Sequence, residues 1–147
     1  ICSKLTQIWK LETCRFTRMF KIEDIKAAHS KVKSGADFPA YIKEIAALGV
    51  QSYQTFVSDG HVDYNGAGTF KIETPGKYDV QKVAPSADKD SFLRILKEHQ
   101  QGKTDYPTFC SQCALYGIDS WVVDISCKTC TYYDSAGNKL LVESIPV

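Results

Sequence analysis

Four segments of the chain carry apolar residues at helical spacing. Such residues recur every three or four positions in each segment, which is typical of an amphipathic helix with one buried face. Asp37 and Asp105 stand at expected N-caps, each two positions before a proline, and Gly49 and Gly117 follow the last apolar positions. We therefore predict two consecutive pairs of helices, over 22–32, 37–48, 92–99 and 105–116.

Strand patterns follow each predicted helix pair. Apolar and polar residues alternate over 53–57 after the first pair and over 121–125 after the second, as in half-buried strands. Asp59-Gly60 is typical of a tight turn and predicts a return strand at 62–64. Further strands are expected at 69–73 and 139–143, with an extra connecting strand at 78–83.

The helix and strand patterns occur twice. Residues 37–53 align with 105–121 at a constant offset of 68, and five of the seventeen positions are identical, where ordinary residue frequencies give about one. The repeat predicts an α+β fold made of a duplicated α-α-β-β-β unit with pseudo-twofold symmetry. Its helices should cover one side of antiparallel meanders, because only one strand face is strongly apolar. The expected organisation is one domain at 19–147, with repeat one at 22–73, the connecting strand at 78–83 and repeat two at 90–144.

The composition is that of a folded and nearly neutral protein. The 147 residues include 18 Lys plus Arg and 17 Asp plus Glu, and 44% are hydrophobic. This balance argues against a disordered chain and gives no electrostatic basis for binding nucleic acid. No apolar run approaches the ~20 residues of a membrane span, and the first residues lack the apolar centre of a signal peptide. We expect a cytoplasmic protein with reduced thiols, no cofactor, and no membrane or nucleic-acid partner.

Residues 1–18 differ in charge from the rest of the chain. They carry a net charge of +3 and are followed by Met19, the only methionine. We expect this stretch to be an N-terminal extension outside the native protein, with Met19 as the natural start. The alternative is a short edge strand or amphipathic helix that packs Ile8, Trp9, Leu11 and Phe16.

Four cysteines have the spacing of a zinc ribbon. Cys110 and Cys113 form one CxxC pair, and Cys127 and Cys130 form another. The repeat argues against metal, because the first pair takes the places of isoleucines on the buried face of the equivalent helix, and a free cysteine packs as a small hydrophobe. The preferred interpretation is structural; the four-cysteine zinc site and a reactive thiol are the alternatives.

The hairpin at 59–64 carries the clearest candidate chemistry. Asp59, His61 and Asp63 are spaced by two, so an extended strand would place them on one face, and Tyr64 follows them. Carboxylates beside an imidazole can serve general acid–base catalysis. A solvent-facing hairpin with ordinary turn residues is the simpler interpretation. His29 lies on the apolar stripe of the first helix, where we expect a core or half-buried histidine.

Three further sequence blocks carry a resemblance to a known family. They are GVQSYQTFVSDGHVDYNG at 49–66, HQQGKTDYPTFC at 99–110, and WVVD…CTYYDSAGNKLLVESIP within 121–146. Together they resemble the domain of unknown function 1398 family, small bacterial and prophage-borne proteins of the YbcV/YdfO kind. The resemblance implies a duplicated α+β domain in a bacterial cytosolic or phage context, without a specific chemistry. By matching position it makes Tyr64, Trp121 and Asp124 weak ligand-binding candidates.

Three functions remain open from the sequence. The preferred one is a non-enzymatic binding or accessory module for a host or phage protein or a small ligand, because no nucleophilic triad, phosphate-binding loop or HExxH motif occurs. It predicts an exposed apolar patch on a sheet face or a pocket at the junction of the repeats. The alternatives are a small enzyme or ligand receptor that uses the Asp59/His61/Asp63/Tyr64 hairpin, and a zinc-stabilised module that uses the two CxxC pairs.

Overall fold

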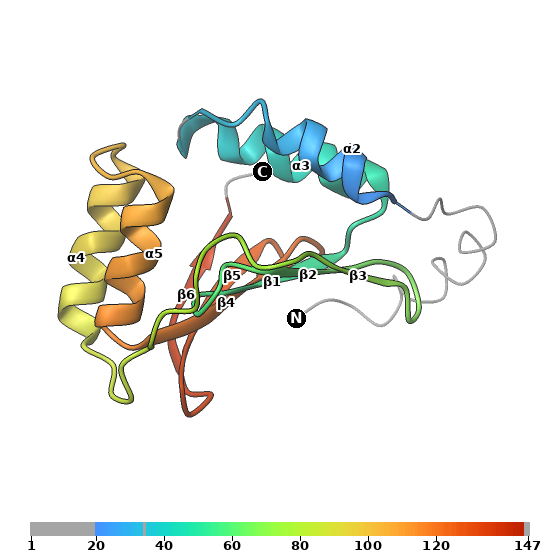
Figure 1. Cartoon of the computed structure of the whole chain (residues 1–147). Coiled ribbons are helices and arrows are strands. Elements are labelled where there is room, and N and C mark those ends of the chain that lie inside the picture. The colour runs from blue at the N-terminus through green and yellow to red at the C-terminus, as the bar shows by residue number, and fades with distance from the viewer. Residues whose placement is uncertain (1–19, 34, 146–147) are drawn as a thin grey trace.

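The computed structural model describes residues 20–33 and 35–145 (Figure 1). Two helices and three strands come first, and two helices and three strands follow. The elements are α2 (Ile22–His29), η1 (Gly35–Asp37), α3 (Phe38–Leu48), β1 (Ser52–Phe56), β2 (Val62–Asn65), β3 (Lys71–Glu73), α4 (Lys89–Gln100), α5 (Tyr106–Leu115), β4 (Ile118–Asp124), β5 (Thr129–Asp134) and β6 (Lys139–Ser144). The predicted extension at 1–18 lies outside the described residues.

The strands form one antiparallel sheet. Its order is β3-β2-β1-β4-β5-β6, so each three-strand meander runs outward from the central pair of β1 and β4. In that pair Ser52 lies opposite Asp124, Gln54 opposite Val122, and Phe56 opposite Ser120. The predicted α+β class and the antiparallel meanders are confirmed by this topology.

One face of the sheet is buried beneath the helices. The strand register places alternate residues on this face, and their side chains are all buried: Tyr53, Thr55, Val62, Tyr64, Trp121, Val123, Cys130 and Tyr132. From α3, Tyr41 lies beside Tyr64 in the core, and from α5 the ring of Phe109 packs 5.7 Å from that of Trp121. In Figure 1 both helix pairs accordingly lie on the same side of the curved sheet.

The helix ends follow the predicted capping residues with one exception. Asp105 accepts a hydrogen bond from the Thr108 backbone N–H at 2.8 Å and caps α5. Gly49 ends α3 with a left-handed φ of 110°. Asp37 stands at the N-cap position of α3 as predicted, but its side chain makes no capping hydrogen bond; it ends the short η1 turn and accepts a hydrogen bond from the Lys33 backbone N–H at 2.9 Å. The capping bond is missing because an extra 3-10 turn precedes this helix.

The connecting strand predicted at 78–83 is also wrong. This segment has no strand partner, because its backbone bonds to irregular neighbours instead. The Tyr78 and Gln81 N–H groups donate to the Asp59 and Ser58 carbonyls at 3.3 and 2.7 Å. Residues 78–83 therefore form an extended segment that crosses the β1–β2 turn and do not add a strand to the sheet.

Candidate functional site

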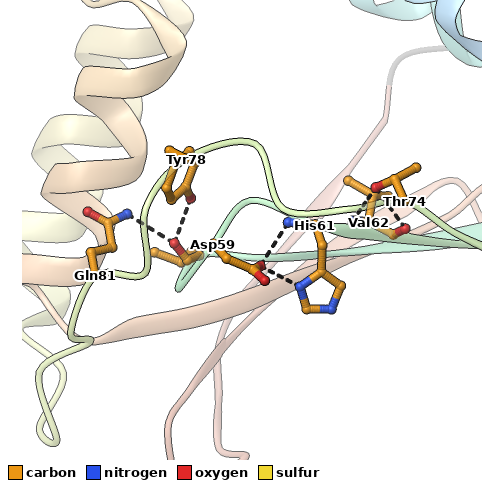
Figure 2. Close-up of polar contacts among 7 residues, drawn as sticks. Asp59, His61, Val62, Thr74, Tyr78 and Gln81 are labelled. Carbon is orange, nitrogen blue, oxygen red and sulfur yellow. Dashed lines mark hydrogen bonds and ion pairs between the residues drawn. The ribbon is translucent and has the colours of Figure 1, made fainter.

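Asp59 and His61 form a hydrogen-bonded pair in the turn between β1 and β2 (Figure 2). The His61 backbone N–H donates to Asp59 Oδ1 at 2.9 Å, and its ring Nδ1 bonds the same oxygen. The ring also stacks on Phe56, with centroids 4.2 Å apart and planes 8° from parallel. These contacts fix the orientation of the imidazole and direct Nε2 away from Asp59. The hydrogen bonds from His61 hold the pKa of Asp59 below its usual value.

Other predicted site residues do not join this pair. Asp63 lies on the same side of the sheet as His61, but its Oδ2 pairs with Lys71 Nζ at 3.4 Å. Tyr64 points to the opposite face, where it is buried against Tyr41. The strand alternation that brings residues 61 and 63 to one face necessarily sends residue 64 to the other. The structure thus brings together two of the four hairpin side chains.

Trp121 and Asp124 have structural contacts. Trp121 is 8% exposed, and its ring packs 5.7 Å from Phe109 and 6.1 Å from Tyr132. Asp124 accepts a hydrogen bond from the Cys127 backbone N–H at 2.9 Å, which closes the turn between β4 and β5. These contacts give both Trp121 and Asp124 a structural role in the fold.

The cysteines of the CxxC pairs lie in different surroundings. Cys110 and Cys113 are buried in α5, as their repeat counterparts predicted, and Cys130 is buried in β5. Cys127 is disulfide-bonded, so the expectation of reduced thiols is wrong for this residue. Burial raises the pKa of Cys113 and raises that of Cys130 to about 12, so both thiols stay protonated at neutral pH. Over residues 20–33 and 35–145, no group of three or more His, Cys, Asp and Glu side chains is placed to hold a metal ion.

A pocket that the sequence did not predict opens between α2 and the segment that follows β3. Its volume is about 330 Å³. Two walls line it, one from α2 and one from residues 74–77, and Tyr64 lies between them. The described lining residues are Ile22, Ile25, Lys26, His29, Ser30, Tyr64, Thr74, Pro75, Gly76 and Lys77.

Hydrogen bonds to the β1–β2 turn hold the 74–77 wall in place. The Thr74 hydroxyl donates to the Val62 carbonyl at 3.2 Å and accepts from the Val62 N–H at 2.8 Å (Figure 2). The Lys77 N–H donates to the Asp59 carbonyl at 2.7 Å. Just beyond the wall, the Tyr78 hydroxyl and the Gln81 amide both donate to the Val57 carbonyl, at 2.5 and 3.0 Å. The Asp59–His61 turn therefore positions one side of the pocket.

Gly60 allows Tyr78, just beyond the 74–77 wall, to approach the turn. Its φ is +78°, and a Cβ at this position would lie 2.5 Å from the Tyr78 ring. Because both the backbone conformation and the space exclude a side chain, the Asp59-Gly60-His61 sequence has a structural reason of its own. Gly60 therefore allows Tyr78 to pack against the turn, besides linking Asp59 to His61.

Basic side chains surround the pocket. Lys26 and His29 project from the last turn of α2, and Lys77 comes from the opposite wall. Lys77 Nζ also lies 5.8 Å from the centre of the Tyr106 ring in α5. Partial removal of water lowers the pKa of Lys77 and of His29, and the nearby Lys77 charge lowers that of His29 further. No acidic residue occurs among the described lining residues.

His29 differs from its predicted place. It is exposed at the pocket rather than in the core, with its ring edge-on to Tyr41 at 5.5 Å. The i, i+3 spacing of Lys26 and His29 was the only available signal in the sequence. It could not reveal the pocket, because the second wall lies about forty-five residues further along the chain.

A family comparison places these features in a wider group of proteins. The family described as Protein of unknown function (DUF1398) matches residues 26–144, which is most of the chain. The chain belongs to this family. The match to DUF1398 includes the Asp59–His61 turn, both walls of the pocket from Lys26 onward, and all six strands. No curated protein matches the chain.

None of the helices in the described part of this DUF1398 member has the length and apolar character needed to cross a membrane.

The Asp59–His61 pair predicts an acid-dependent loss of stability. Because the pKa of Asp59 is lower in the folded chain than its ordinary 3.8, ionised Asp59 stabilises the fold above that pH, and the contribution is lost as pH falls through the folded pKa. We expect Asp59→Asn to lower the free energy of unfolding by less than about 1 kcal/mol at pH 7, because the site is partly exposed. Urea unfolding from pH 7 to pH 2 should show this difference disappearing at acid pH.

The matched control for that measurement is Asp79→Asn, on the exposed part of the 78–83 segment. It should change stability little at any pH. A difference between Asp59→Asn and the parent chain that stayed constant down to pH 2 would contradict a contribution from the ionised carboxylate.

Proposed function

We propose that this DUF1398 protein is a non-enzymatic binding module that holds a small ligand in the pocket between α2 and residues 74–77. The observation that carries the proposal is a pocket whose two walls are separately fixed by the fold. One wall is a helix packed on the core through Ile25 and Ala28, and the other is hydrogen-bonded to the β1–β2 turn. A site of this kind needs little reorganisation when a ligand binds, which favours affinity.

The lining combines an apolar base with a polar rim. Ile25 and Tyr64 are 1% and 6% exposed and form the base, whereas Lys26, His29 and Ser30 are exposed at the rim. Small-molecule sites are commonly apolar with a few polar groups that orient the ligand. This distribution supports binding of a compound that has both an apolar body and a polar group.

The hydroxyl groups of the lining favour binding over catalysis. The Ser30 hydroxyl donates to the Ala27 carbonyl at 2.6 Å, and the Thr74 hydroxyl donates to Val62. Neither hydroxyl contacts His29, so neither has the adjacent base that activates a nucleophile. The Asp59–His61 pair lies on the other side of the sheet from Tyr64 and does not line the pocket.

Protein-observed NMR tests this proposal with four probes: benzoate, phenyl phosphate, benzamide and benzylamine. We expect at least one probe to shift amide signals of residues 22–30 and 74–77 in a saturable way. Ser30→Trp should abolish the shifts by filling the pocket mouth. Ala27→Trp is the matched control, because Ala27 is an exposed residue of the same helix that does not line the pocket. Shifts absent with all four probes, or unaffected by Ser30→Trp, would contradict the proposal.

We also infer that the two halves are copies related by a pseudo-twofold axis. The β1–β4 register supports this, since Gln54 lies opposite Val122, its own counterpart at the sequence offset of 68. Ser52 and Phe56 lie opposite the counterparts of each other, Asp124 and Ser120, as a twofold axis through the central pair requires. An experimental structure in which the two halves had different strand orders would reject the duplication.

A further inference from the structure

We propose that the pocket recognises a small ligand through its anionic group, a carboxylate or a phosphate monoester, held between Lys26 on α2 and Lys77 on the opposite wall. This inference rests on the proposed function and names the chemical class of its ligand. It is carried by the placement of two basic side chains on facing walls of one pocket whose described lining has no acidic residue.

Both lysines are available to a ligand. Neither forms an ion pair with any described residue, whereas Lys31 pairs with Glu44 at 2.8 Å and Lys71 pairs with Glu73 at 3.0 Å. The contact of Lys77 with the face of Tyr106 does not neutralise its charge. An ammonium group without a carboxylate partner can form a charge-assisted hydrogen bond with an anion.

Two acidic residues beside the 74–77 wall, Asp59 and Glu73, are already engaged. The Asp59 carboxylate lies behind Gly76, where a Cβ on the glycine would be 3.3 Å from Oδ2, but that carboxylate binds His61. Glu73 precedes the 74–77 wall and pairs with Lys71 on the helix-free face of the sheet. Neither carboxylate therefore competes with a ligand for Lys26 or Lys77.

The end of α2 opposes an anion only weakly. Helix α2 ends at His29, and a helix C-terminus carries about half a negative charge. Two lysine ammonium groups contribute about two positive charges at neutral pH, so attraction exceeds this repulsion. The balance of charge at the pocket favours an anionic ligand over a cationic one.

The apolar base defines the rest of the ligand. Ile22, Ile25 and Pro75 line the pocket beside the basic side chains, and the ring of Tyr64 lies at its base. An aromatic or branched aliphatic body would remove the exposed parts of Ile22 and Pro75 from water while its acidic group reached the rim. We therefore expect small aromatic or branched carboxylates or phosphates to bind, and their unsubstituted neutral analogues to bind less well.

Charge-removing variants test the inference in titrations with the same probes. Lys26→Gln and Lys77→Gln should each weaken binding of benzoate or phenyl phosphate about tenfold, since each removes a charge-assisted contact. Binding of benzamide should be unchanged. Lys82→Gln is the matched control, because it changes the net charge equally, follows on the same segment and does not line the pocket. Benzoate and phenyl phosphate distinguish a carboxylate from a phosphate as the preferred group.

The outcomes separate this inference from the proposed function. Benzamide binding in the pocket as tightly as benzoate and phenyl phosphate, or anion affinities that match in Lys77→Gln, Lys26→Gln and Lys82→Gln, would overturn anion recognition and leave small-ligand binding intact. Failure of all four probes to perturb the pocket would overturn both. Amide spectra unchanged outside the pocket would establish that the variants are folded, so a loss of affinity would report the removed charge.

Discussion

Replacing Trp121 by alanine is expected to lower the free energy of unfolding by about 3–5 kcal/mol. Trp121 belongs to the central strand β4 and is 8% exposed. Its ring packs 5.7 Å from Phe109 of α5 and 6.1 Å from Tyr132 of β5, so it joins the second helix pair to the sheet. The cavity left by the indole would be lined by groups that cannot all move into it, because each belongs to a different element.

Urea denaturation at neutral pH measures this effect. Val142→Ala in β6 is the control, because Val142 is 53% exposed and loses little buried area. The control should stay within about 0.5 kcal/mol of the parent chain. A loss below about 1 kcal/mol for Trp121→Ala would mean that the ring contributes little to the core, and it would return Trp121 to the list of binding candidates.

Gly117→Ala is expected to destabilise the chain by about 2–6 kcal/mol, the sum of backbone strain and overpacking. Gly117 lies between α5 and β4 with a φ of +80°, and a Cβ there would be 2.4 Å from the Ser86 carbonyl oxygen and 2.7 Å from Ala87 Cα. The opposing backbone cannot withdraw easily, because the Asp88 N–H donates to the Tyr116 carbonyl at 2.9 Å. Both the conformation and the close approach therefore require glycine.

Gly137→Ala separates these two causes. Gly137 has a φ of +83°, but a Cβ on it would meet no atom within 4 Å. Its substitution should cost only the backbone strain, about 1–3 kcal/mol. Equal losses for Gly117→Ala and Gly137→Ala in thermal and urea unfolding would show that the Ser86–Ala87 backbone moves aside, contrary to the expectation.

Local patterns predicted most of the secondary structure. Apolar spacing identified the four helices, and alternation identified the strands at 53–57 and 121–125, because each pattern depends on neighbours within about one turn or one strand. The 78–83 segment resembled a strand in composition, yet its hydrogen-bond partners include the carbonyls of residues 57–59, which lie 19 to 24 residues earlier. Composition alone cannot distinguish a strand of the sheet from an extended segment bonded to a turn, because the hydrogen-bond partners lie far away in the sequence.

The features of the candidate site that the sequence predicted are also local ones. The Asp59–His61 contact spans two residues around Gly60, so it could be anticipated from the hairpin sequence. The period of two in a strand also determines that Tyr64 faces away from His61. Burial of Cys110 and Cys113 followed from the isoleucines at the matching places of the first half. Each of these features depends on spacing along one element.

The sequence by itself determined the α+β class, the position of the helices and most strands, and the DUF1398 resemblance, because these depend on local periodicity and on residue order. Only the tertiary structure decided that Lys26 and Lys77 share a pocket. Their meeting depends on packing α2 over the sheet and on hydrogen bonds that tie residues 74–81 to the β1–β2 turn. In the sequence each lysine is an ordinary charged residue, and the two line one pocket only because distant segments pack together.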